Sequence, residues 1–454
     1  TCLAKIEVKP VEGSTPDSTT SFSTNYGRID VIWLSGTTNV VANPQKPNAP
    51  ILKSGTESMT PVKWNASNEI VETTATDSSW YNYVAGSGNN DNSQKENTLS
   101  HWANAKTLNE SYFVWIPRYA YRITYYNSET STEPTGYYDG YGMWNATNGT
   151  IKYELEDGVR VVDYNGEKYI VHPAFCTDLD LGGWDSNLAG FWFAKFEMSG
   201  STGEALKSTY AVQSIRNQNI GTQYTNARNA TYGYAGTAET IIVNGTDFTH
   251  TSYMNSHMCK NSEWGAVAYL THSQYGRNGT EITINSSTSF YTGGGPEVTD
   301  YIANVAQSTT GNPYGIYDMS GGANEKTASF DKLGNTERLT RVDIGKKLID
   351  EVQKDDEENY TSTKYATAYK NGTSIEDGTG IYTICKTGDG TKEVYKGSTQ
   401  YGWDNHYALF ATFNDPFFNR GGQHNYQNNA GVFFSFHASG FGYDNNTFRT
   451  ILSP

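Results

Sequence analysis

The stretch that decides the fold is RGGQHNYQNNAGVFFSFHASGFGYDNNTFRTILSP, which covers residues 420–454. Its two ends resemble framework: an Arg-Gly-Gly turn opens it at residues 420–422, and Phe-Arg-Thr-Ile-Leu closes it at residues 448–452. Between them lie His, Asn, Tyr, Phe, Ser and Gly residues with no regular period over the whole segment. Two ordered flanks around an irregular aromatic and amide segment indicate a scaffold that holds an unusual surface.

The composition of the whole chain fits an irregular globular protein. Its 454 residues are enough for one large domain and a smaller one. The chain has 34 Tyr, 18 Phe, 10 Trp and 45 Gly, which predicts an aromatic core and a loop-rich fold that leans towards strands. A formal net charge of −15 leaves no basic stripe for a nucleic acid, and the densest charge run, residues 346–358, predicts a short solvated helix. No apolar run reaches the length of about 18 residues that predicts a membrane span.

The first fifty residues predict a small β attachment module that precedes a domain over residues 51–454. Residues 4–9 alternate apolar and charged side chains, as a half-buried strand does, and residues 28–34 form a second strand pattern. Residues 43–50 contain three prolines, which hold their neighbours out of the helical region and predict a stiff linker. Such a module could join the protein to a filament or an anchor, or donate a strand to a neighbouring subunit.

Cysteine is rare and scattered, at Cys2, Cys176, Cys259 and Cys385. This spacing does not fit a disulfide framework, although one or two bridges would suit an oxidising compartment. Cys2 also fits a lipid anchor. Because residue 1 is not Met, we expect it to begin a mature or trimmed chain.

Local patterns in the larger domain predict individual elements. Residues 111–123 form a strong buried strand pattern, interrupted by a proline and an arginine that indicate a bulge or a strand start at that point. Asn165-Gly166 predicts the turn of a hairpin. Residues 260–270 give the best helix pattern, with Asn261 or Ser262 as the expected N-cap.

A series of short motifs follows a known order between residues 112 and 454. The motifs are Phe-Val-Trp-Ile-Pro at 113–117, Gly-Phe-Trp-Phe-Ala-Lys-Phe-Glu-Met at 190–198, Asn-Ser-Glu-Trp-Gly-Ala-Val-Ala-Tyr at 261–269, Gly-Ile-Tyr-Asp-Met-Ser-Gly-Gly at 315–322, and Arg-Gly-Gly at 420–422 with Thr-Phe-Arg at 447–449. In this order they resemble the motifs of the formylglycine-generating, or sulfatase-modifying factor, family. The resemblance implies that family's C-type-lectin-like fold, so we expect an α+β, irregular, loop-rich domain of this type.

The enzymatic branch of that family requires reactive cysteines near the closing block. Residues 420–454 contain no cysteine, and Cys385 lies upstream without a partner in register, so a thiolate mechanism lacks its nucleophile. The family's Asn-Val-Trp-Glu-Trp run is replaced by Gly-Ala-Asn-Glu-Lys at residues 322–326, which puts an inherited calcium site in doubt. We therefore expect no catalytic residue, no metal ligand and no cofactor other than a structural calcium ion.

A second branch consists of binding proteins that retroelements diversify on the same scaffold. Their variable positions arise from Asn codons randomised at adenines, which yield His, Tyr, Asp, Ser, Phe, Gly, Ala and Asn but not Gln, Lys, Glu, Met or Trp. Residues 433–446 stay within this set, whereas Gln423 and Gln427 fall outside it and would belong to a fixed frame. Rings and small amides are also the side chains that antibody-like surfaces use.

Ten residues are the predicted ligand-binding residues: His424, Tyr426, Phe433, Ser435, His437, Ser439, Phe441, Tyr443, Asp444 and Asn446. Period-two alternation predicts that Val432, Phe434 and Phe436 face the core. The opposite side of the strand, with the loop at residues 438–443, is then the expected contact surface.

Other constellations are better explained as structure. His250, His257 and Cys259 do not have the spacing of a zinc site. Asp178, Asp180 and Asp185 lack the remaining ligands of a calcium loop. Gly293–Gly295 is followed by proline and not by the Lys-Ser/Thr of a phosphate-binding loop, and no nucleophile elbow is present. Arg420 is expected to brace the fold through a buried carboxylate.

These observations predict a non-catalytic protein exposed on a bacterial surface or a phage particle, where it binds a protein or a glycan. Two alternatives remain at this point. One is a structural subunit of an extracellular filament or pilus. The other is an enzyme that uses an unrecognised site, which a cluster of titratable side chains converging in one pocket would favour.

Overall fold

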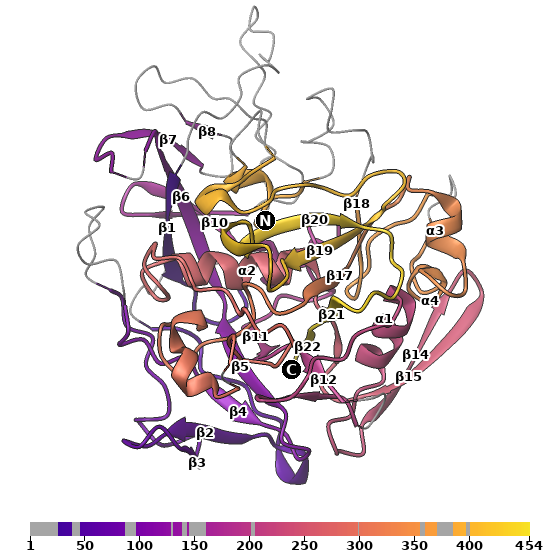
Figure 1. The fold of residues 1–454 in the computed structure, drawn as a ribbon, viewed down its shortest axis with the longest axis horizontal. Helices are drawn as coiled ribbons and strands as arrows, with labels where there is room; N and C mark the ends of the chain where they lie inside the picture. Colours follow the sequence, from indigo (N-terminus) through magenta and orange to yellow (C-terminus); the bar gives the residue numbers. More distant parts are fainter. Residues whose placement is uncertain are drawn as a thin grey trace, which may run out of the picture.

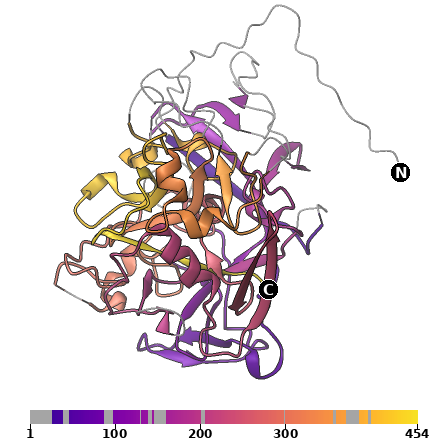
Figure 2. The same ribbon diagram turned by 90° about the vertical axis from the view of Figure 1, so that its right-hand side faces the viewer.

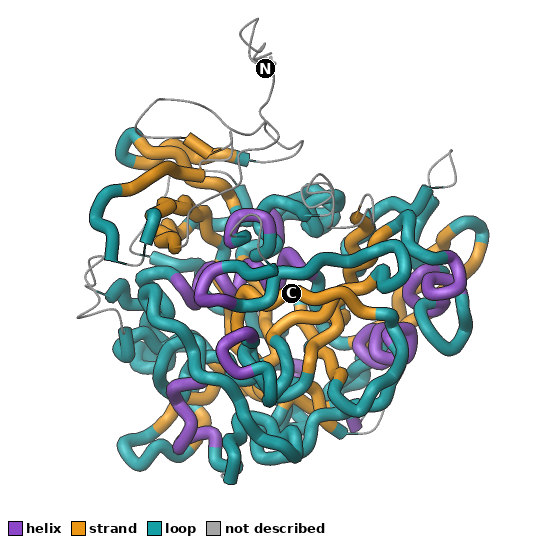
Figure 3. Tube along the Cα trace, turned by 45° about the horizontal axis from the view of Figure 1, so that its top comes forward, coloured by secondary structure: helices purple, strands orange, loops and turns teal. Residues whose placement is uncertain are grey.

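The computed structural model describes residues 26–38, 46–86, 97–128, 130–138, 143–144, 160–200, 205–297, 299–354, 359–369, 385–395 and 400–454. Strands predominate over helices in this part of the chain, and long loops join both, as the composition predicts. Figure 3 shows how much of the outline consists of loops. The helix α2 (Asn261–His272) contacts β1 (Tyr26–Trp33) as well as β17 (Asn324–Asp331) and β20 (Gly431–Ala438), so it lies between two of the sheets (Figure 1).

A six-stranded antiparallel sheet is arranged around β6 (Tyr119–Tyr126). One edge of β6 pairs with the whole of β1, from Tyr26 opposite Tyr126 to Trp33 opposite Tyr119. The other members are β7 (Pro134–Tyr138), β8 (Met143–Trp144), β9 (Val161–Tyr164) and β10 (Glu167–Val171). The predicted hairpin is confirmed, since β9 and β10 meet at Asn165-Gly166, where both residues have the positive φ that such a turn requires.

The strand predicted at residues 28–34 is therefore real, but it does not belong to a separate module. Trp33 is completely buried in the main core, where its ring lies 4.5 Å from that of Tyr275. Asn48, in the expected linker, donates to the backbone carbonyl of Ala189 at 2.9 Å and accepts from the indole N–H of Trp115 at 3.0 Å. The boundary expected at residue 50 is thus wrong for β1, because an apolar strand without its own core must pair elsewhere; residues 4–9 lie outside the described residues.

A seven-stranded antiparallel sheet contains the first and last framework motifs. Its order is β16 (His257–Met258), β22 (Thr450–Leu452), β11 (Gly190–Ala194), β5 (Tyr112–Pro117), β4 (Asn104–Lys106), β2 (Thr60–Trp64) and β3 (Ile70–Glu72). Both β5 and β11 are buried along their entire length. Of the two alternatives for residues 111–123, the strand start is confirmed and the bulge is wrong, because β5 ends at Pro117 and β6 begins at Tyr119 in another sheet. Arg118 lies between them, and its buried guanidinium donates to Phe175 O at 2.6 Å.

The third sheet carries the C-terminal region. Its order is β18 (Thr367–Tyr369), β17, β19 (Phe417–Gly421) and β20, and β21 (Asn446–Phe448) runs parallel beside β17. In Figure 2 the yellow C-terminal part of the chain lies on one side of the molecule, away from the purple strands at the bottom.

The predicted helix is confirmed as α2, with a different cap. Lys260 is the N-cap, and the Glu263 carboxylate accepts from its backbone N–H at 2.8 Å. All twelve residues of α2 are buried, so the helix has no solvated face. The core around it is largely aromatic, with eight fully buried tryptophans: Trp33, Trp80, Trp102, Trp115, Trp184, Trp192, Trp264 and Trp403.

Short elements complete the fold. The remaining helices are α1 (Ile220–Arg228), α3 (Thr336–Thr340) and α4 (Lys346–Ile349), with 3-10 turns η1 (Gly55–Glu57), η2 (Pro173–Phe175), η4 (Tyr301–Gln307), η6 (Lys392–Val394), η7 (Trp403–Asn405) and η8 (Gln427–Asn429). Two hairpins stand apart from the sheets: β12 (Met198–Ser199) with β13 (Lys207–Ser208), and β14 (Thr237–Val243) with β15 (Thr246–Ser252). The charged run at residues 346–358 is not fully solvated, because Leu348, Ile349 and Glu351 are buried.

Candidate functional site

The loop over residues 439–445, between β20 and β21, is held almost entirely through its main chain. Its backbone carbonyls accept hydrogen bonds from residues that lie outside it. These bonds run from Ile220 N to Gly440 O (2.9 Å), from Lys326 Nζ to Phe441 O (2.5 Å), from Asn217 N to Tyr443 O (3.0 Å), from Arg216 Nη1 to Asp444 O (2.5 Å) and from Asn324 N to Asn445 O (2.9 Å). Because main-chain groups are the same for every residue type, this loop keeps its frame when its side chains change.

Most side chains of this loop point away from the frame. Tyr443 is 49% exposed, Asp444 is exposed and Ser439 is half-buried. The ring of Phe441 is half-buried beneath the Arg338 guanidinium, 4.6 Å away. Gly442 is the exception, since a Cβ there would come within 2.8 Å of the Asn217 backbone.

Lys326 is a frame residue that the sequence reasoning missed. It lies on β17, is fully buried, and donates to the carbonyls of Phe441 and of Gln218 (3.1 Å). Burial lowers the pKa of its ammonium to about 7. The replacement at residues 322–326 that weakened the family comparison therefore supplies an anchor for the 439–445 loop.

Rings from two loops and from β20 form a half-exposed aromatic cluster, which we define as Tyr401, Tyr407, Tyr426, Phe434 and Phe436. Tyr401 and Tyr407 stack at 5.4 Å, and Tyr407 meets Tyr426 edge-on at 5.9 Å. Phe434 is buried beneath Tyr426 (5.7 Å), and Phe436 stacks on Phe434 (6.2 Å) and on His437 (4.5 Å). Exposed and half-exposed rings of this kind are common contact residues in binding surfaces.

The predicted contact face of β20 is wrong at two positions, whereas Val432 and Phe434 are buried as predicted. Phe433 is fully buried and packs against Trp403 and His272, on the side of α2. Ser435 is also fully buried, because the segment at residues 407–409 pairs with that edge of β20. Asn446 is buried as well, at the start of β21. These three residues are therefore frame residues and not contact residues.

The remaining predicted residues lie at the surface or just below it. His437 is half-buried, and its Nδ1 lies 3.1 Å from the Asp415 carboxylate, whose pKa it lowers through that hydrogen bond. His424 and Tyr426 are half-buried on the segment before β20. The His424 ring packs edge-on against Phe290 at 4.8 Å, and burial lowers its pKa.

One group of described side chains brings three candidate metal-ligating atoms within 4.8 Å of one another: Glu281, Asp404 and His406. His406 Nδ1 accepts from the backbone N–H of Phe433 at 3.3 Å, so the ring proton resides on Nε2, which lies 3.4 Å from Glu281 Oε1. A metal on Nε2 would require that atom to be proton-free, and metal-ligating histidines donate from their other nitrogen. The geometry therefore fits a proton-sharing cluster better than a metal site.

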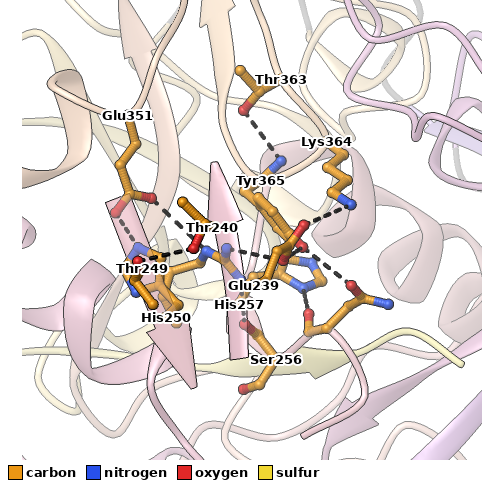
Figure 4. A network of polar contacts seen from close by, with 12 residues as sticks. Glu239, Thr240, Thr249, His250, Ser256, His257, Glu351, Thr363, Lys364 and Tyr365 are labelled. Carbon is orange, nitrogen blue, oxygen red and sulfur yellow. Dashed lines mark hydrogen bonds and ion pairs between the residues drawn. The ribbon is translucent and has the colours of Figure 1, made fainter. Parts of the chain in front are cut away.

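A network of polar side chains joins β14 and β15 to Glu351 and to residues 363–365, as Figure 4 shows, and Tyr224 connects α1 to it. Glu351 accepts from Tyr224 at 2.8 Å and from His250, and Glu239 accepts from Tyr365 at 2.6 Å and from Lys364 at 3.2 Å. A cavity of about 530 Å³ lies beside Glu239. The Glu239 carboxylate already accepts from Tyr365 and Lys364, and these partners lower its pKa. Glu239 is therefore a poor general base. The network therefore has the character of a structural brace.

Side chains of the constellations that the sequence analysis set aside have structural partners. His257 faces Glu263 at 2.9 Å, whereas His250 faces Glu351. Asp185 pairs with Lys364 at 3.1 Å, and Asp178 caps a turn at Leu181 N. Arg420 does brace the fold, but through the backbone carbonyls of Asp389 and Gly390.

The described cysteines, Cys176, Cys259 and Cys385, are free and buried, and burial raises the pKa of each thiol. Such thiols are weak nucleophiles near neutral pH. Cys2 lies outside the described residues.

Comparison with protein-family models returns no match for the chain, and no curated protein is detectably similar to it. None of the described helices has both the length and the apolar character needed to cross a bilayer.

Proposed function

We propose that this protein is a non-catalytic ligand-binding protein, exposed on a cell or particle surface, with a C-type-lectin-like scaffold. Its contact surface, which we call the display surface, consists of the 439–445 loop and the aromatic cluster. The ligand is a protein or a glycan on another cell or particle. The motif resemblance supplies the scaffold, and the contact residues come from this chain's own geometry.

One observation carries the proposal: the 439–445 loop is fixed by main-chain hydrogen bonds while Ser439, Tyr443 and Asp444 project from it. A surface of this design accepts many side-chain combinations on one backbone, as antibody loops do. A catalytic site has the opposite requirement, because its side chains must be fixed in position.

The first test is sequencing of the 3′ end of the gene and its flanking DNA across many isolates. Differences confined to codons for Ser439, Phe441, Tyr443 and Asp444, with Gly442 constant and a near-copy of the segment nearby, would support a diversified binder. A constant segment without a template copy would exclude diversification. Self-assembly of isolated chains would then favour the filament subunit, in which a neighbour covers the aromatic cluster.

The second test measures binding directly, on a glycan array and on intact bacterial and epithelial cells. The triple variant Ser439→Ala, Tyr443→Ala, Asp444→Ala should lose the binding of the native chain while its melting temperature stays within about 2 °C. Variants at Thr240 and Thr249, on the exposed face of the β14–β15 hairpin, serve as controls and should bind like the native chain. Retained binding in the triple variant would place the ligand elsewhere.

A further inference from the structure

The Glu281, Asp404 and His406 side chains lie beneath one half of the display surface. Asp404 and His406 belong to the loop over residues 400–409, whose two surface tyrosines, Tyr401 and Tyr407, supply the outer rings of the aromatic cluster. Trp403 is buried beneath this loop against Phe433, at 5.6 Å between ring centroids. The position of the loop therefore sets the position of both tyrosines.

The backbone of this loop is strained at its centre. Asp404 and Asn405 have φ angles of 55° and 63°, a left-handed conformation that non-glycine residues adopt at a free-energy cost. Two backbone hydrogen bonds close the turn itself, Gly402 N to His406 O (2.8 Å) and His406 N to Trp403 O (3.1 Å). Four more hold the rest of the loop: Tyr407 N to Asn429 O (3.0 Å), Ala408 N to Gln400 O (3.0 Å), Leu409 N to Ser435 O (2.8 Å) and Ser435 N to Tyr407 O (2.8 Å). The strained turn is therefore the part of the loop that is sensitive to the charges around it.

Two carboxyl groups meet beside this turn. Glu281, on the segment after α2, and Asp404 lie within 4.8 Å, and the Nδ1 atom of His406 accepts a backbone hydrogen bond from Phe433 N. The His406 and His272 rings lower the pKa of Asp404 but do not cancel the effect of burial and of Glu281. His272, at the end of α2, also faces Asp404, and its Nε2 interacts with Gly27 O at 3.0 Å. Arg277 contacts Glu281 through that residue's backbone carbonyl, at 3.5 Å. Two adjacent carboxylates ionise together only at a cost, so this arrangement favours one shared proton.

We propose that these side chains order the loop at residues 400–409 in mildly acidic solution and loosen it towards neutral pH, so that the aromatic half of the display surface is regulated by pH. The inference rests on the proposed function only where it takes Tyr401 and Tyr407 as ligand contacts. The pH-dependent ordering of the loop does not depend on a ligand.

The direction follows from proton uptake. Burial, and then the charge of Glu281, raise the pKa of Asp404 from its ordinary 3.8 to about 6. The ordered loop therefore binds a proton that the released loop does not, and its stability is greatest below the raised value and is lost as the pH rises through it. With an Asp404 pKa of about 6 in the ordered loop and 3.8 in the released loop, the ratio of ordered to released loop should fall about tenfold between about pH 5 and about pH 7.5.

Hydrogen exchange measured by mass spectrometry tests this inference without a ligand. After correction for the intrinsic pH dependence of exchange, the amides of residues 402–407 in the native chain should lose protection by about tenfold between about pH 5 and about pH 7.5. In Asp404→Asn, protection should be independent of pH, because an amide cannot ionise. Glu281→Gln removes the neighbouring charge, so the loss of protection should move to lower pH, because burial alone then raises the pKa of Asp404. It provides a second variant if Asp404→Asn does not fold.

Asp163→Asn is the matched control, because Asp163 is exposed and pairs with Lys168, at 3.1 Å, away from the loop at residues 400–409. It should keep the pH dependence of the native chain. The inference is overturned if native protection is equal at both pH values, or if Asp404→Asn keeps the pH dependence. It is also overturned if millimolar calcium or zinc chloride restores protection at neutral pH, since the three side chains would then form a metal site. A failure here leaves the sequencing and array tests of the proposed function unaffected.

Discussion

Phe433 and Tyr443, two aromatic residues ten positions apart, have opposite roles: the first belongs to the buried frame and the second to the exposed surface. Phe433 is fully buried against Trp403, whereas Tyr443 is 49% exposed and contributes its backbone carbonyl, not its ring, to the frame. The variant Tyr443→Ala should change the free energy of unfolding by less than about 0.5 kcal/mol, as a surface substitution does.

The paired variant Phe433→Ala should lower the free energy of unfolding by about 3–5 kcal/mol, because it leaves a cavity in the core. Urea unfolding of both variants measures the difference. Equal losses would mean that the Tyr443 ring is part of the core in solution, and would remove it from the display surface.

Arg449, in the closing Phe-Arg motif, is a second residue whose substitution should lower the stability of the scaffold. It is fully buried and binds both oxygens of Glu325, at 2.9 Å and 2.5 Å, and donates to Ala194 O at 2.8 Å. Arg449→Lys cannot reproduce this planar set of bonds and should lower the free energy of unfolding by about 3–5 kcal/mol.

The exposed pair of Arg341 and Asp343 provides the control for Arg449. Arg341→Lys should leave the free energy of unfolding close to that of the native chain, since solvent screens exposed pairs. A similar loss in both variants would contradict the framework role of Arg449.

At the scale of elements, β17 acts on the 439–445 loop through Lys326. The folded protein holds the Lys326 pKa at about 7, below its ordinary value of 10.5, so the folded state prefers the neutral amine. The contribution of Lys326 to the free energy of unfolding is therefore lowest below its folded-state pKa. It rises as the pH approaches the ordinary pKa of 10.5, by about 2 kcal/mol between about pH 7 and about pH 9.

The variant Lys326→Met removes the titrating group and should abolish that rise relative to the native chain. It should also increase hydrogen exchange in the 439–445 loop, because two carbonyls lose their donor. Chemical denaturation at the two pH values checks the first effect, and Lys168→Met, at an exposed pair, controls for loss of charge. An unchanged rise in Lys326→Met would show that Lys326 keeps an ordinary pKa.

Helices and turns were predicted from the sequence more accurately than the buried and exposed faces of strands. The helix α2 and the β9–β10 turn were predictable because a local pattern determines each. Alternation failed in β20 because the strand is covered on both sides, by α2 beneath Phe433 and by Tyr407 and Tyr426 around Phe434. A strand covered on both sides shows a continuous apolar run, in which neither face is marked.

Contacts between segments that are far apart in the chain could not be predicted from the sequence either. Lys326 and Glu351 resemble ordinary charged surface residues until the fold buries them beside Phe441 and His250. The same holds for Asp404 and Glu281, which are more than one hundred positions apart in the chain. The ten predicted contact residues therefore included seven at or near the surface and missed Tyr401, Tyr407 and Phe436.

At the scale of the whole molecule, β1 is part of the main body. A chain that begins at residue 46 lacks β1 and leaves β6 without its partner along eight residue pairs, and it also lacks Trp33. Such a chain should not show cooperative unfolding, because an exposed apolar strand edge and a large core cavity remain. Circular dichroism during heating measures this, with a chain that begins at Tyr26 as the control. Cooperative unfolding of the shorter chain would restore the separate module.

The strand β22 lies inside the seven-stranded sheet, between β11 and β16. Its residues are translated after the 439–445 loop, so β11 and β16 cannot be joined until translation has passed through the codons of that loop. A frameshift or stop codon introduced within those codons would delete β21 and β22 and leave a chain that cannot close its sheet. Proteolysis would then remove it. The fold therefore acts as a reading-frame check: only genes that remain intact through the codons of residues 439–445 yield a stable product.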